Sequence, residues 1–381
     1  MKILHVITDL DIGGAETMLL RLVTGMDPTR FESRVVSLVP PGPVGARMAE
    51  AGIPVLSLGM RRGVPSPAGL WRLTRILRDF RPDVVQTWLY HADLAGLAAL
   101  RLAFPLGRRP ALAWNIRCSF MALDEYRALT SWTLKACARL SGLPDVVLAN
   151  SHEARRFHES LGYRPKRFEV IPNGFDTAAF RPDAEARQAV RAELGIPADA
   201  PVIGMVARFD PMKNHAGFIE AAALAEPSLE APHFLLVGRD ADDENRDIRR
   251  WLSYSGLDAG RVHLLGERSD VARLMAAMDI HVSASLGESF PNAVGESMAC
   301  GVPNAVTDVG DSKLLVGDTG IAVPPDDPQA LAEAMVALIR SLSPIDSERR
   351  NPRARIENTY SLAAAIDKFS ELYAELNLSP L

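Results

Sequence analysis

The sequence predicts an α/β protein built from two Rossmann-like domains. Its 381 residues are enough for two ordinary domains and exceed what a single small core requires. Hydrophobic residues make up 48% and charged residues 23%, a composition typical of globular rather than disordered chains. Short apolar runs alternate with amphipathic helical stretches along the chain, and this alternation is typical of parallel sheets with crossover helices.

The first half of the chain carries six apolar runs that we expect to be strands. They lie at Ile3–Ile7, Arg34–Leu38, Val55–Leu58, Val84–Thr87, Leu112–Ile116 and Val146–Ala149. Helical patterns separate these runs, for example at Gly69–Phe80 and Glu125–Leu140. This order of elements predicts a first parallel sheet.

A second series of the same kind follows. We expect its strands at Val202–Met205, Phe234–Val237, Val262–Leu264, Ile280–Val282 and Asn304–Thr307. Helical patterns lie at Asn214–Leu224, Val271–Met278 and Gln329–Arg340. The turn signal Pro172-Asn173-Gly174 places the predicted domains at residues 1–175 and 176–360. We expect the remaining segment, 361–381, to form a helix that packs back across the junction.

The chain shows neither a membrane-spanning segment nor a disulfide pattern. The best apolar run, Leu94–Phe104, contains Arg101 and falls short of the roughly 20 residues that span a bilayer. The first residues, MKILHVITDL, lack the pattern of a cleavable signal peptide. Cys118, Cys137 and Cys300 are scattered and odd in number, which fits a reducing compartment. We therefore expect a cytoplasmic protein.

Charge is distributed unevenly along the chain. Residues 1–175 carry a net charge of +8 and residues 176–381 a net charge of −13, within a total of −5. A basic first half and an acidic second half suggest different partners for the two halves. The negative total and the lack of a basic-aromatic platform argue against nucleic acid as a partner.

The first candidate binding element is the turn Gly13-Gly14-Ala15-Glu16, which follows the first strand and opens a helix. Two glycines let a backbone approach a ligand closely, and the N–H groups of a helix start favour an anion. The turn does not match Gly-x-Gly-x-x-Gly, so a dinucleotide cofactor has little support. The alternative is a tight strand-to-helix turn without a ligand.

The second candidate is a pair of cations, Arg208 and Lys213, on the loop after the first strand of the second series. In open α/β sheets, ligands bind in the crevice at the carboxyl ends of the strands. Arg grips phosphate with a planar fork of donors, and Lys adds a mobile point charge. The alternative is two solvated surface cations.

The third candidate is a pair of carboxylates, Glu288 and Glu296. We expect Glu288 on a loop after a strand, and Glu296 about one turn inside a helix that begins near Pro291. The first N–H groups of that helix would hold phosphate or sugar hydroxyls, and Glu296 would reach a ribose. The alternative for Glu296 alone is an ordinary solvated residue. The residues of this stretch expected to bind are Glu288, Phe290, Pro291, Asn292, Ala293, Val294 and Glu296.

Together and in this order, the motifs resemble the family 4 retaining glycosyltransferases, of glycosyltransferase group 1 type. The resemblance spans nearly the full chain and implies the GT-B architecture, in which the parallel sheets of two Rossmann-like domains face across a cleft. The matching segments are the Gly13-Gly14-Ala15-Glu16 turn, Val170–Asp176, the Arg208/Lys213 pair, Leu235–Gly238, the Glu288/Glu296 pair, Met298–Pro303 and Thr307–Gly310.

The resemblance implies that the second domain binds a nucleotide sugar and the first domain the acceptor. Gly13 and Gly14 then approach the donor diphosphate, which Arg208 and Lys213 neutralise. Glu288 contacts the donor sugar and Glu296 the ribose. The donor-binding residues implied are Gly13, Gly14, Arg208, Lys213, Gly238, Arg268, Glu288, Phe290, Pro291, Asn292, Ala293, Val294 and Glu296.

The family also tends to place a histidine of the first domain near the sugar. His91 is the best match, because His5 lies inside an expected strand and is better explained as a core residue. The alternative for His91 is a helix-start residue without a ligand. The implied catalytic residues are Glu288, His91, Arg208 and Lys213.

Three features depart from the family pattern or compete with it. Asn304 interrupts a strand that is commonly apolar, and Asp311-Ser312-Lys313-Leu314 stands where an acidic residue often follows Thr-Asp-Val-Gly. Neither removes a phosphate or ribose contact, but both leave sugar and acceptor selectivity open. The acidic run Asp240–Glu244 is expected to be a solvated loop, because no second cluster supports a metal site.

The implied reaction transfers a hexose to a saccharide or lipid-linked acceptor with retention of anomeric configuration, as in envelope or exopolysaccharide synthesis. No cofactor or metal is expected, since the nucleotide sugar is a substrate, with a UDP-sugar favoured over a GDP-sugar. Two alternatives stay open. A nucleotide-sugar epimerase shares this architecture and needs no acceptor, and a non-catalytic protein would only bind sugar nucleotides.

The basic residues of the first domain suggest where in the cell the protein acts. Arg61 and Arg62 follow the third strand, and Arg72, Arg75 and Arg78 recur every three residues along a helix. We expect peripheral contact with the anionic inner face of the cytoplasmic membrane, because basic residues near such a surface favour docking. The alternative is an amphipathic helix whose arginines are merely solvated.

Overall fold

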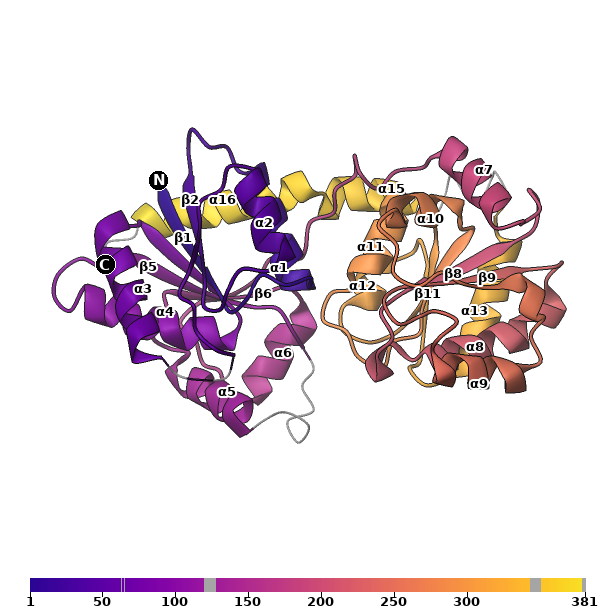
Figure 1. The fold of residues 1–381 in the computed structure, drawn as a ribbon, viewed down its shortest axis with the longest axis horizontal. Coiled ribbons are helices and arrows are strands. Elements are labelled where there is room, and N and C mark those ends of the chain that lie inside the picture. Colours follow the sequence, from indigo (N-terminus) through magenta and orange to yellow (C-terminus); the bar gives the residue numbers. More distant parts are fainter. Residues whose placement is uncertain (63, 65, 120–127, 343–350, 379–381) are drawn as a thin grey trace. The chain divides into compact units, whose positions relative to one another are not determined.

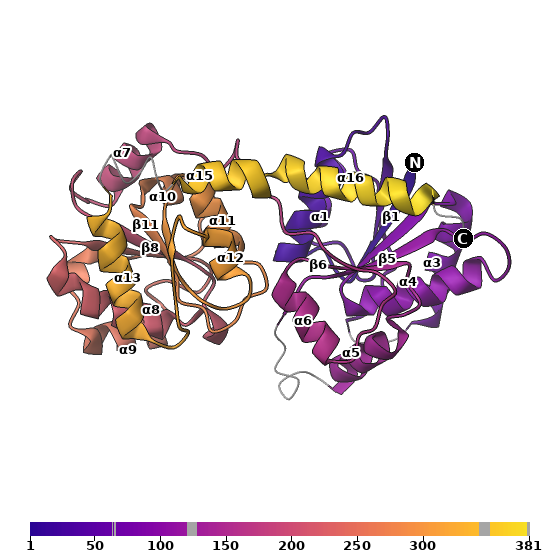
Figure 2. The same ribbon diagram turned by 180° about the vertical axis from the view of Figure 1, so that it is seen from behind.

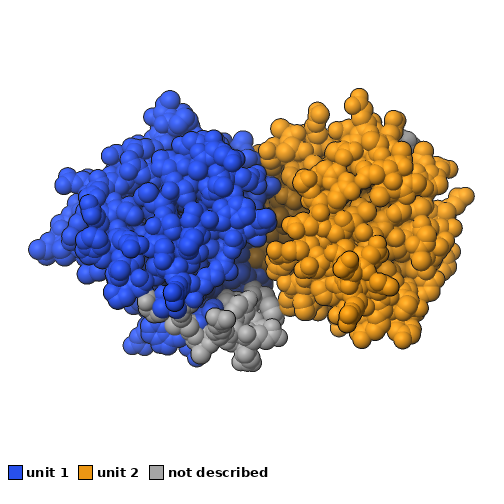
Figure 3. Space-filling view, in the orientation of Figure 1, with its two compact units in different colours: residues 1–174, 362–381 blue, residues 175–361 orange. Residues whose placement is uncertain are grey.

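The computed structural model describes residues 1–62, 64, 66–119, 128–342 and 351–378. The chain divides into two compact units. Unit 1 comprises residues 1–174 and 362–381, and unit 2 comprises residues 175–361 (Figure 3). None of the helices in the described part of the chain combines the length and apolar character needed to cross a bilayer.

Unit 1 is a parallel sheet of seven strands in the order β3-β2-β1-β4-β5-β6-β7. Figure 1 labels β1, β2, β5 and β6 of this sheet. The strands are β1 (Lys2–Ile7), β2 (Glu32–Ser37), β3 (Val55–Ser57), β4 (Val84–Trp88), β5 (Ala111–Ile116), β6 (Val146–Ala149) and β7 (Phe168–Val170). The six predicted strands fall on β1 to β6. The seventh, β7, has three partly buried residues, too few for a periodic pattern.

Helices cover both faces of this sheet. They are α1 (Gly14–Gly25), α2 (Pro43–Glu50), α3 (Pro67–Phe80), α4 (Tyr90–Ala103), α5 (Ala128–Leu140), α6 (His152–Ser160) and α16 (Leu362–Leu378). In β1, Ile3 packs into one core with α1 and α16, and Leu4 into the other with α3 and α4. The predicted helix at 125–140 is described only from Ala128, and its residues 125–127 lie outside the described residues.

The last helix belongs to unit 1, although the chain reaches it only after completing unit 2. Figure 2 shows α16 beside α1 and β1. Its Phe369 and Tyr373 are fully buried in the same core as Trp88. The Tyr373 hydroxyl also donates a hydrogen bond to the Gln86 side chain, so α16 is anchored on the sheet by polar and apolar contacts together. Residues 379–381 of the predicted helical segment lie outside the described residues.

Unit 2 is a parallel sheet of six strands in the order β10-β9-β8-β11-β12-β13. The strands are β8 (Val202–Val206), β9 (His233–Val237), β10 (Val262–Leu264), β11 (Ile280–Ser283), β12 (Asn304–Thr307) and β13 (Ile321–Val323). The five predicted strands fall on β8 to β12, and β13 is again a short edge strand. The helices are α7 (Ala184–Glu193), α8 (His215–Ala225), α9 (Arg246–Ser255), α10 (Val271–Ala277), α11 (Asn292–Ala299), α12 (Ser312–Val316), α13 (Pro328–Arg340) and α15 (Pro352–Arg355), with short turns η1 (Pro211–Lys213), η2 (Glu226–Ser228), η3 (Ala259–Arg261) and η4 (Ile356–Tyr360).

The first six strands of unit 1 and the six strands of unit 2 share one order, which confirms the predicted α/β class with two parallel sheets. In each sheet the strand order reverses beside the first strand of the unit. This topological switch point lies between β1 and β4 in unit 1 and between β8 and β11 in unit 2. Ligands of open α/β sheets bind outside the carboxyl ends of the strands at such points. Each switch point is therefore a candidate site.

Candidate functional site

Two predicted cations lie on the loop that follows β8 in unit 2. Asp210 organises this loop, because its Oδ1 accepts a hydrogen bond from the backbone N of Met212 (2.9 Å) and begins the turn η1. Its Oδ2 accepts hydrogen bonds from Nη2 (2.9 Å) and Nε (3.2 Å) of Arg208. The Arg208 side chain is 56% exposed, whereas that of Lys213 is 25% exposed. Lys213 is therefore the more enclosed of the two cations.

An ion pair between Lys213 and Glu288 joins the two loops at the switch point of unit 2. The same Glu288 oxygen accepts a hydrogen bond from Ser285 Oγ (2.8 Å). The two loops are also joined through their backbones, because Leu286 N donates to the carbonyl of Met212 (2.8 Å). The structure thus brings together a cation after β8 and a carboxylate after β11, and their predicted contacts with a donor stay predictions.

The Thr307–Gly310 segment packs against the backbone of the loop that carries Glu288. Gly310 has φ +58°, and a Cβ at this position would lie 2.3 Å from the carbonyl oxygen of Glu288. The next residue, Asp311, donates its backbone N–H to the carbonyl of Ser289 (3.1 Å). Glycine is therefore required at 310 because the two loops touch. The motif was recognised from the sequence, but its role in holding Glu288 becomes clear only in the structure.

Helix α11 follows Glu288 and carries the remaining predicted residues of this stretch. Pro291 precedes its first residue, so the N–H groups of Asn292, Ala293 and Val294 form the first turn, where a helix lacks internal acceptors. Glu296 lies one turn further along and is half-buried. This turn provides donors for an anion or hydroxyl at the same edge of the sheet as Lys213.

A buried aromatic stack holds α11 in place. Phe290 is 5% exposed and stacks on Phe175, with ring centres 6.0 Å apart. A Cβ on Gly295 would lie 2.0 Å from the Phe175 ring, so only glycine allows this approach. Phe290 is thus a support beneath the predicted donor-binding residues, and its predicted contact with a ligand stays a prediction.

Asn304, which the sequence marks as a departure from the family pattern, anchors α11 to the sheet. Its Oδ1 accepts a hydrogen bond from Ser297 Oγ (2.8 Å) and lies 2.7 Å from Nδ1 of His281 on the neighbouring strand. Its Nδ2 donates to the carbonyl of Val302 (2.9 Å). Burial lowers the pKa of His281 to about 4, so the network is neutral. The network holds Ser297, the residue next to Glu296, against the sheet.

A close contact between two loops also explains why glycine occupies position 238. It has φ +150°, and a Cβ there would lie 2.1 Å from the carbonyl oxygen of Ala207 and 2.8 Å from the backbone N of Arg208. Only glycine lets the loop after β9 come this close to the loop that carries Arg208. Gly238 therefore shapes the switch point through its backbone.

Arg268 lies on the loop after β10, beyond β9 from the switch point. Its Nε and Nη2 each donate to Asp270 (2.8 Å), and its Nη1 donates to Glu193 (3.0 Å). These hydrogen bonds, above all the two to Asp270, raise the pKa of Arg268. The structure groups Arg268 with these carboxylates rather than with Lys213 and Glu288, and its predicted donor contact stays a prediction.

In unit 1, the Gly13-Gly14 turn follows β1 at the switch point. Gly13 precedes α1, and a Cβ on it would lie 2.2 Å from Oε2 of Glu16. The Glu16 carboxyl therefore folds back over the start of its own helix, where it is 7% exposed. Burial raises the pKa of Glu16 to about 7, and the charges of Asp9 and Asp11 add to that effect.

The two histidines singled out from the sequence lie in different surroundings. His91 is in the first turn of α4 and half-buried, and burial lowers its pKa. The residue before α4, Leu89, has φ +71°, a conformation that non-glycine residues rarely adopt and that is often found at functional sites. His5 is fully buried, and its Nδ1 accepts a hydrogen bond from Trp88 Nε1 (3.4 Å). His5 is thus a core residue, and the role of His91 stays a prediction.

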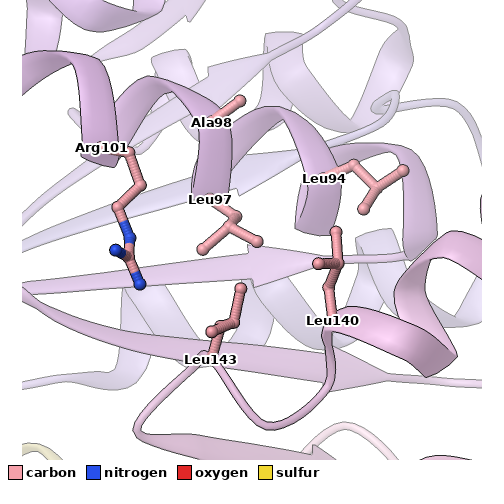
Figure 4. A pocket seen from close by; sticks show the side chains of 6 residues that line it. All are labelled: Leu94, Leu97, Ala98, Arg101, Leu140 and Leu143. Atoms are coloured by element: carbon pink, nitrogen blue, oxygen red, sulfur yellow. The ribbon is translucent and has the colours of Figure 1, made fainter.

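An apolar pocket of unit 1 lies away from the switch point. Figure 4 shows its lining, which comes from α4 and from the end and loop of α5. The lining residues are Leu94, Leu97, Ala98, Arg101, Leu140 and Leu143. The pocket has a volume of about 480 Å³. Helix α4 starts at the carboxyl end of β4 and runs back, so this pocket sits toward the opposite edge of the sheet.

Within the described residues, no group of three or more His, Cys, Asp or Glu side chains is placed to hold a metal ion. The acidic run Asp240–Glu244 forms a turn in which Asp242 Oδ1 accepts the backbone N–H of Glu244 (3.0 Å). Asn245 then donates from its side chain to the carbonyl of Asp240 (2.7 Å). These local hydrogen bonds account for the polar residues of the run.

Comparison with known proteins supplies independent findings. Residues 12–179 match the family model described as Glycosyltransferase Family 4, and residues 200–341 match the model described as Glycosyl transferases group 1. The chain is 28% identical to the UDP-Gal:alpha-D-GlcNAc-diphosphoundecaprenol alpha-1,3-galactosyltransferase of Escherichia coli, over 80% of this chain and 78% of the relative. It is 26% identical to the putative glycosyltransferase EpsF of Bacillus subtilis, over 83% and 81% of the two chains.

Solved structures share the fold. The crystal structure of Anabaena HepE in complex with UDP superimposes with a TM-score of 0.84 at 23% identity, covering 98% of this chain and 100% of that one. Sucrose-phosphate synthase from Thermosynechococcus elongatus superimposes with a TM-score of 0.79 at 20% identity, covering 99% of both chains. At these identities the likeness establishes the architecture, which is GT-B.

Proposed function

Because the chain belongs to the group 1, family 4 glycosyltransferases, which transfer hexoses from nucleotide sugars with retention, we propose that its donor is a UDP-sugar and its acceptor a lipid-linked saccharide. The structural observation that supports donor binding in unit 2 is the Lys213–Glu288 pair at its switch point, with Arg208 on the same loop. A cation for the leaving diphosphate and a carboxylate for the sugar thus occur side by side.

The proposed reaction breaks the bond between the anomeric carbon and the diphosphate oxygen. Negative charge grows on the diphosphate and positive charge on the sugar ring, so the enzyme must stabilise both. We assign the diphosphate to Lys213, Arg208 and the first N–H groups of α11. Glu288 faces the developing positive charge, and Glu296 holds the ribose. Attack from the face that the diphosphate leaves gives retention, with a diphosphate oxygen accepting the proton of the acceptor.

The choice of UDP and of a lipid-linked acceptor is supported by the relatives. The Escherichia coli relative uses UDP-Gal and a diphosphoundecaprenol-linked acceptor, as its name states. HepE was crystallised with UDP-glucose. Titration calorimetry with UDP and GDP tests the base directly, and we expect UDP to bind at least about tenfold more tightly. Equal binding of both nucleotides, or preference for GDP, would overturn the choice.

Product analysis separates this function from its alternatives. Incubation with UDP-sugars and a lipid-diphosphate saccharide should yield an extended acceptor, detected by mass spectrometry. An epimerase would instead convert the UDP-sugar without any acceptor. A protein that only binds sugar nucleotides would leave both compounds unchanged. Conversion of the UDP-sugar into an epimeric UDP-sugar in the absence of acceptor, or no conversion with any UDP- or GDP-sugar, would refute transfer.

We further propose that unit 1 contacts anionic lipid through the outer face of α3, where Trp71 and Arg75 are exposed and the guanidinium lies 5.9 Å from the indole ring centre. A tryptophan beside basic residues suits a membrane interface. Arg75 also forms an ion pair with Asp79 on the same helix (3.6 Å). Arg62, Arg72 and Arg78 contact Asp11 and the carbonyls of Leu58 and Leu102, respectively.

Sedimentation with liposomes tests the lipid contact. Binding should require anionic lipid and weaken with salt. The variant Trp71→Ala/Arg75→Glu should lose binding, whereas Arg155→Glu on the exposed side of α6 is the matched control. Binding to neutral liposomes, or unchanged binding of the double variant, would contradict the contact.

A further inference from the structure

The switch point of unit 1 contains a cation that no motif predicts. Arg117 directly follows β5, and its guanidinium carbon lies 5.2 Å from the centre of the Trp88 ring. Trp88 ends β4, where it pairs with Ile7 of β1 on one side and Asn115 of β5 on the other. Arg117 therefore lies over the end of β4, and it interacts electrostatically with Glu16 in the first turn of α1.

The guanidinium of Arg117 is only partly satisfied. Its Nη2 donates a hydrogen bond to Oδ1 of Asn173. Its Nε and Nη1 are shielded from solvent and have no hydrogen-bond partner among the described residues. Buried polar groups are almost always paired, and leaving a charged one unpaired is costly. Burial accordingly lowers the pKa of Arg117 to about 9, against the opposing charge of Glu16.

The start of α1 favours an anion at this point, and the Glu16 carboxyl, whose pKa burial raises to about 7, is the acidic group of the described residues that acts on Arg117. Helix α1 has twelve residues, and its first N–H groups lie at the same edge of the sheet. The Trp88 ring contributes a π face to the guanidinium but no acceptor for its free N–H groups. Asn115 also has buried side-chain atoms without a partner, and a buried water can satisfy such a neutral amide. Water can accept hydrogen bonds from Arg117 as well, but it carries no net negative charge to balance the guanidinium.

We propose that Arg117 binds a phosphate group of a substrate at the switch point of unit 1, together with the first turn of α1. The inference rests on the proposed function, in which two substrates carry phosphate. The donor diphosphate already has Arg208 and Lys213 in unit 2. The phosphate of a lipid-linked acceptor is therefore the one we expect at Arg117.

The stability of the free protein gives the first test. Arg117→Gln removes a charge with two unmet donors, so its unfolding midpoint should equal or exceed that of the parent. The matched control is Arg109→Gln in the same unit, because Arg109 forms two hydrogen bonds with Asp145 (2.8 and 2.9 Å) and its loss should lower the midpoint. A fall for Arg117→Gln as large as that for Arg109→Gln would assign Arg117 a structural role and overturn the proposal.

Hydrogen exchange of the full chain gives the second test and locates the phosphate. The probes are geranyl diphosphate, which stands for the acceptor phosphate, and UDP-glucose, which stands for the donor. We expect geranyl diphosphate to slow exchange of the amides in residues 14–16 by about tenfold in the parent and not in Arg117→Gln. Arg117→Lys, which keeps the charge, should restore part of the protection.

The outcomes separate the two sources and the two proposals. Protection by geranyl diphosphate assigns the site to the acceptor, and protection by UDP-glucose alone assigns it to the donor; either supports a phosphate site at Arg117. Absence of protection by both probes, or equal protection in Arg117→Gln, overturns it. Geranyl diphosphate binding requires no sugar transfer, so this result can be interpreted even if the parent transfers no sugar and the proposed function fails.

Discussion

Each of the two switch points carries a basic and an acidic side chain, but the cation is ion-paired in unit 2 and, among the described residues, is not in unit 1. In unit 2, the Lys213 ammonium meets the Glu288 carboxylate, to which Ser285 adds a hydrogen bond of 2.8 Å. In unit 1, Arg117 keeps two buried nitrogens without an acceptor, and burial raises the pKa of Glu16 to about 7. The strand order around both points is the same, so the difference lies in the side chains and not in the fold.

This difference indicates how each unit is prepared for a ligand. Lys213 is compensated in the free protein and must share its charge between Glu288 and an arriving anion. Burial of the Arg117 charge without enough acceptors is unfavourable in the free protein. A bound anion would supply those acceptors and reduce this cost. Sites of this second kind trade stability for binding, which is a common pattern at functional positions.

Loss of Lys213 should have the largest effect. Lys213→Ala removes the enclosed cation and leaves Glu288 without it, so we expect kcat/KM for the donor to fall by a factor that corresponds to about 3 kcal/mol. Arg208→Ala should cost about half as much, because Arg208 is 56% exposed and already paired with Asp210. Rates at subsaturating donor measure both. Parent-like rates in both variants would show that the pairing at this switch point is unrelated to the diphosphate.

We expect Glu288 to contribute mainly to turnover and Glu296 mainly to nucleotide affinity. Glu288→Gln should lower kcat by about two orders of magnitude, because charge changes at the sugar during the reaction. Glu296→Gln should instead weaken UDP binding by about tenfold, because the ribose does not change. Calorimetry and steady-state kinetics on the same preparations separate the two effects. Equal losses of UDP affinity in both variants would contradict this division.

Much of the unit 2 site could be predicted from the sequence, because its residues lie in short motifs that follow recognisable strands. Lys213 and Glu288 are 75 positions apart, yet each follows a strand that ends at the same switch point. The close approaches that require Gly238 and Gly310 were not predictable, because the atoms they meet belong to loops distant in the sequence.

Unit 1 was harder to interpret from its sequence. Arg117 stands in Trp114-Asn-Ile-Arg117 without any neighbouring glycine or second cation that signals phosphate. Its importance arises from burial and from missing partners, and neither can be read from spacing. The edge strands β7 and β13 were missed for a different reason, since three residues are too few to show periodicity. The packing of α16 into the core of unit 1 depends on tertiary contacts with residues distant in the sequence.

Two buried asparagines on corresponding strands provide the next comparison. Asn304 on β12 is hydrogen-bonded to Ser297 and Val302, whereas Asn115 on β5 has no partner for its side-chain oxygen or nitrogen among the described residues. Asn304→Ala should lower the free energy of unfolding by about 2 kcal/mol, because it leaves buried partners unsatisfied. Asn115→Ala should cost clearly less. Chemical unfolding of each variant measures this, and equal losses would mean that Asn115 is paired in solution.

The pairing state of Glu16 decides whether the contrast between the two switch points holds. Its pKa rises from 4.5 to about 7 on folding, so between these pH values the folded chain keeps a proton that the unfolded chain releases. This group therefore makes the protein less stable as pH rises from about 4.5 to about 7, by on the order of 1–3 kcal/mol. Glu16→Gln cannot ionise, so it should gain stability relative to the parent between pH 5 and pH 8.

Urea unfolding at both pH values measures that gain. The control is Glu153→Gln, since Glu153 is also an acid in the first turn of a helix in unit 1, but its side chain is 38% exposed and paired with Arg156. Its stability relative to the parent should hardly change with pH. If Glu16→Gln behaves in the same way, Glu16 is ionised throughout and compensates Arg117 in solution. The switch point of unit 1 would then be paired before any ligand arrives, as in unit 2, and the argument for an unmet cation at Arg117 would lose its basis.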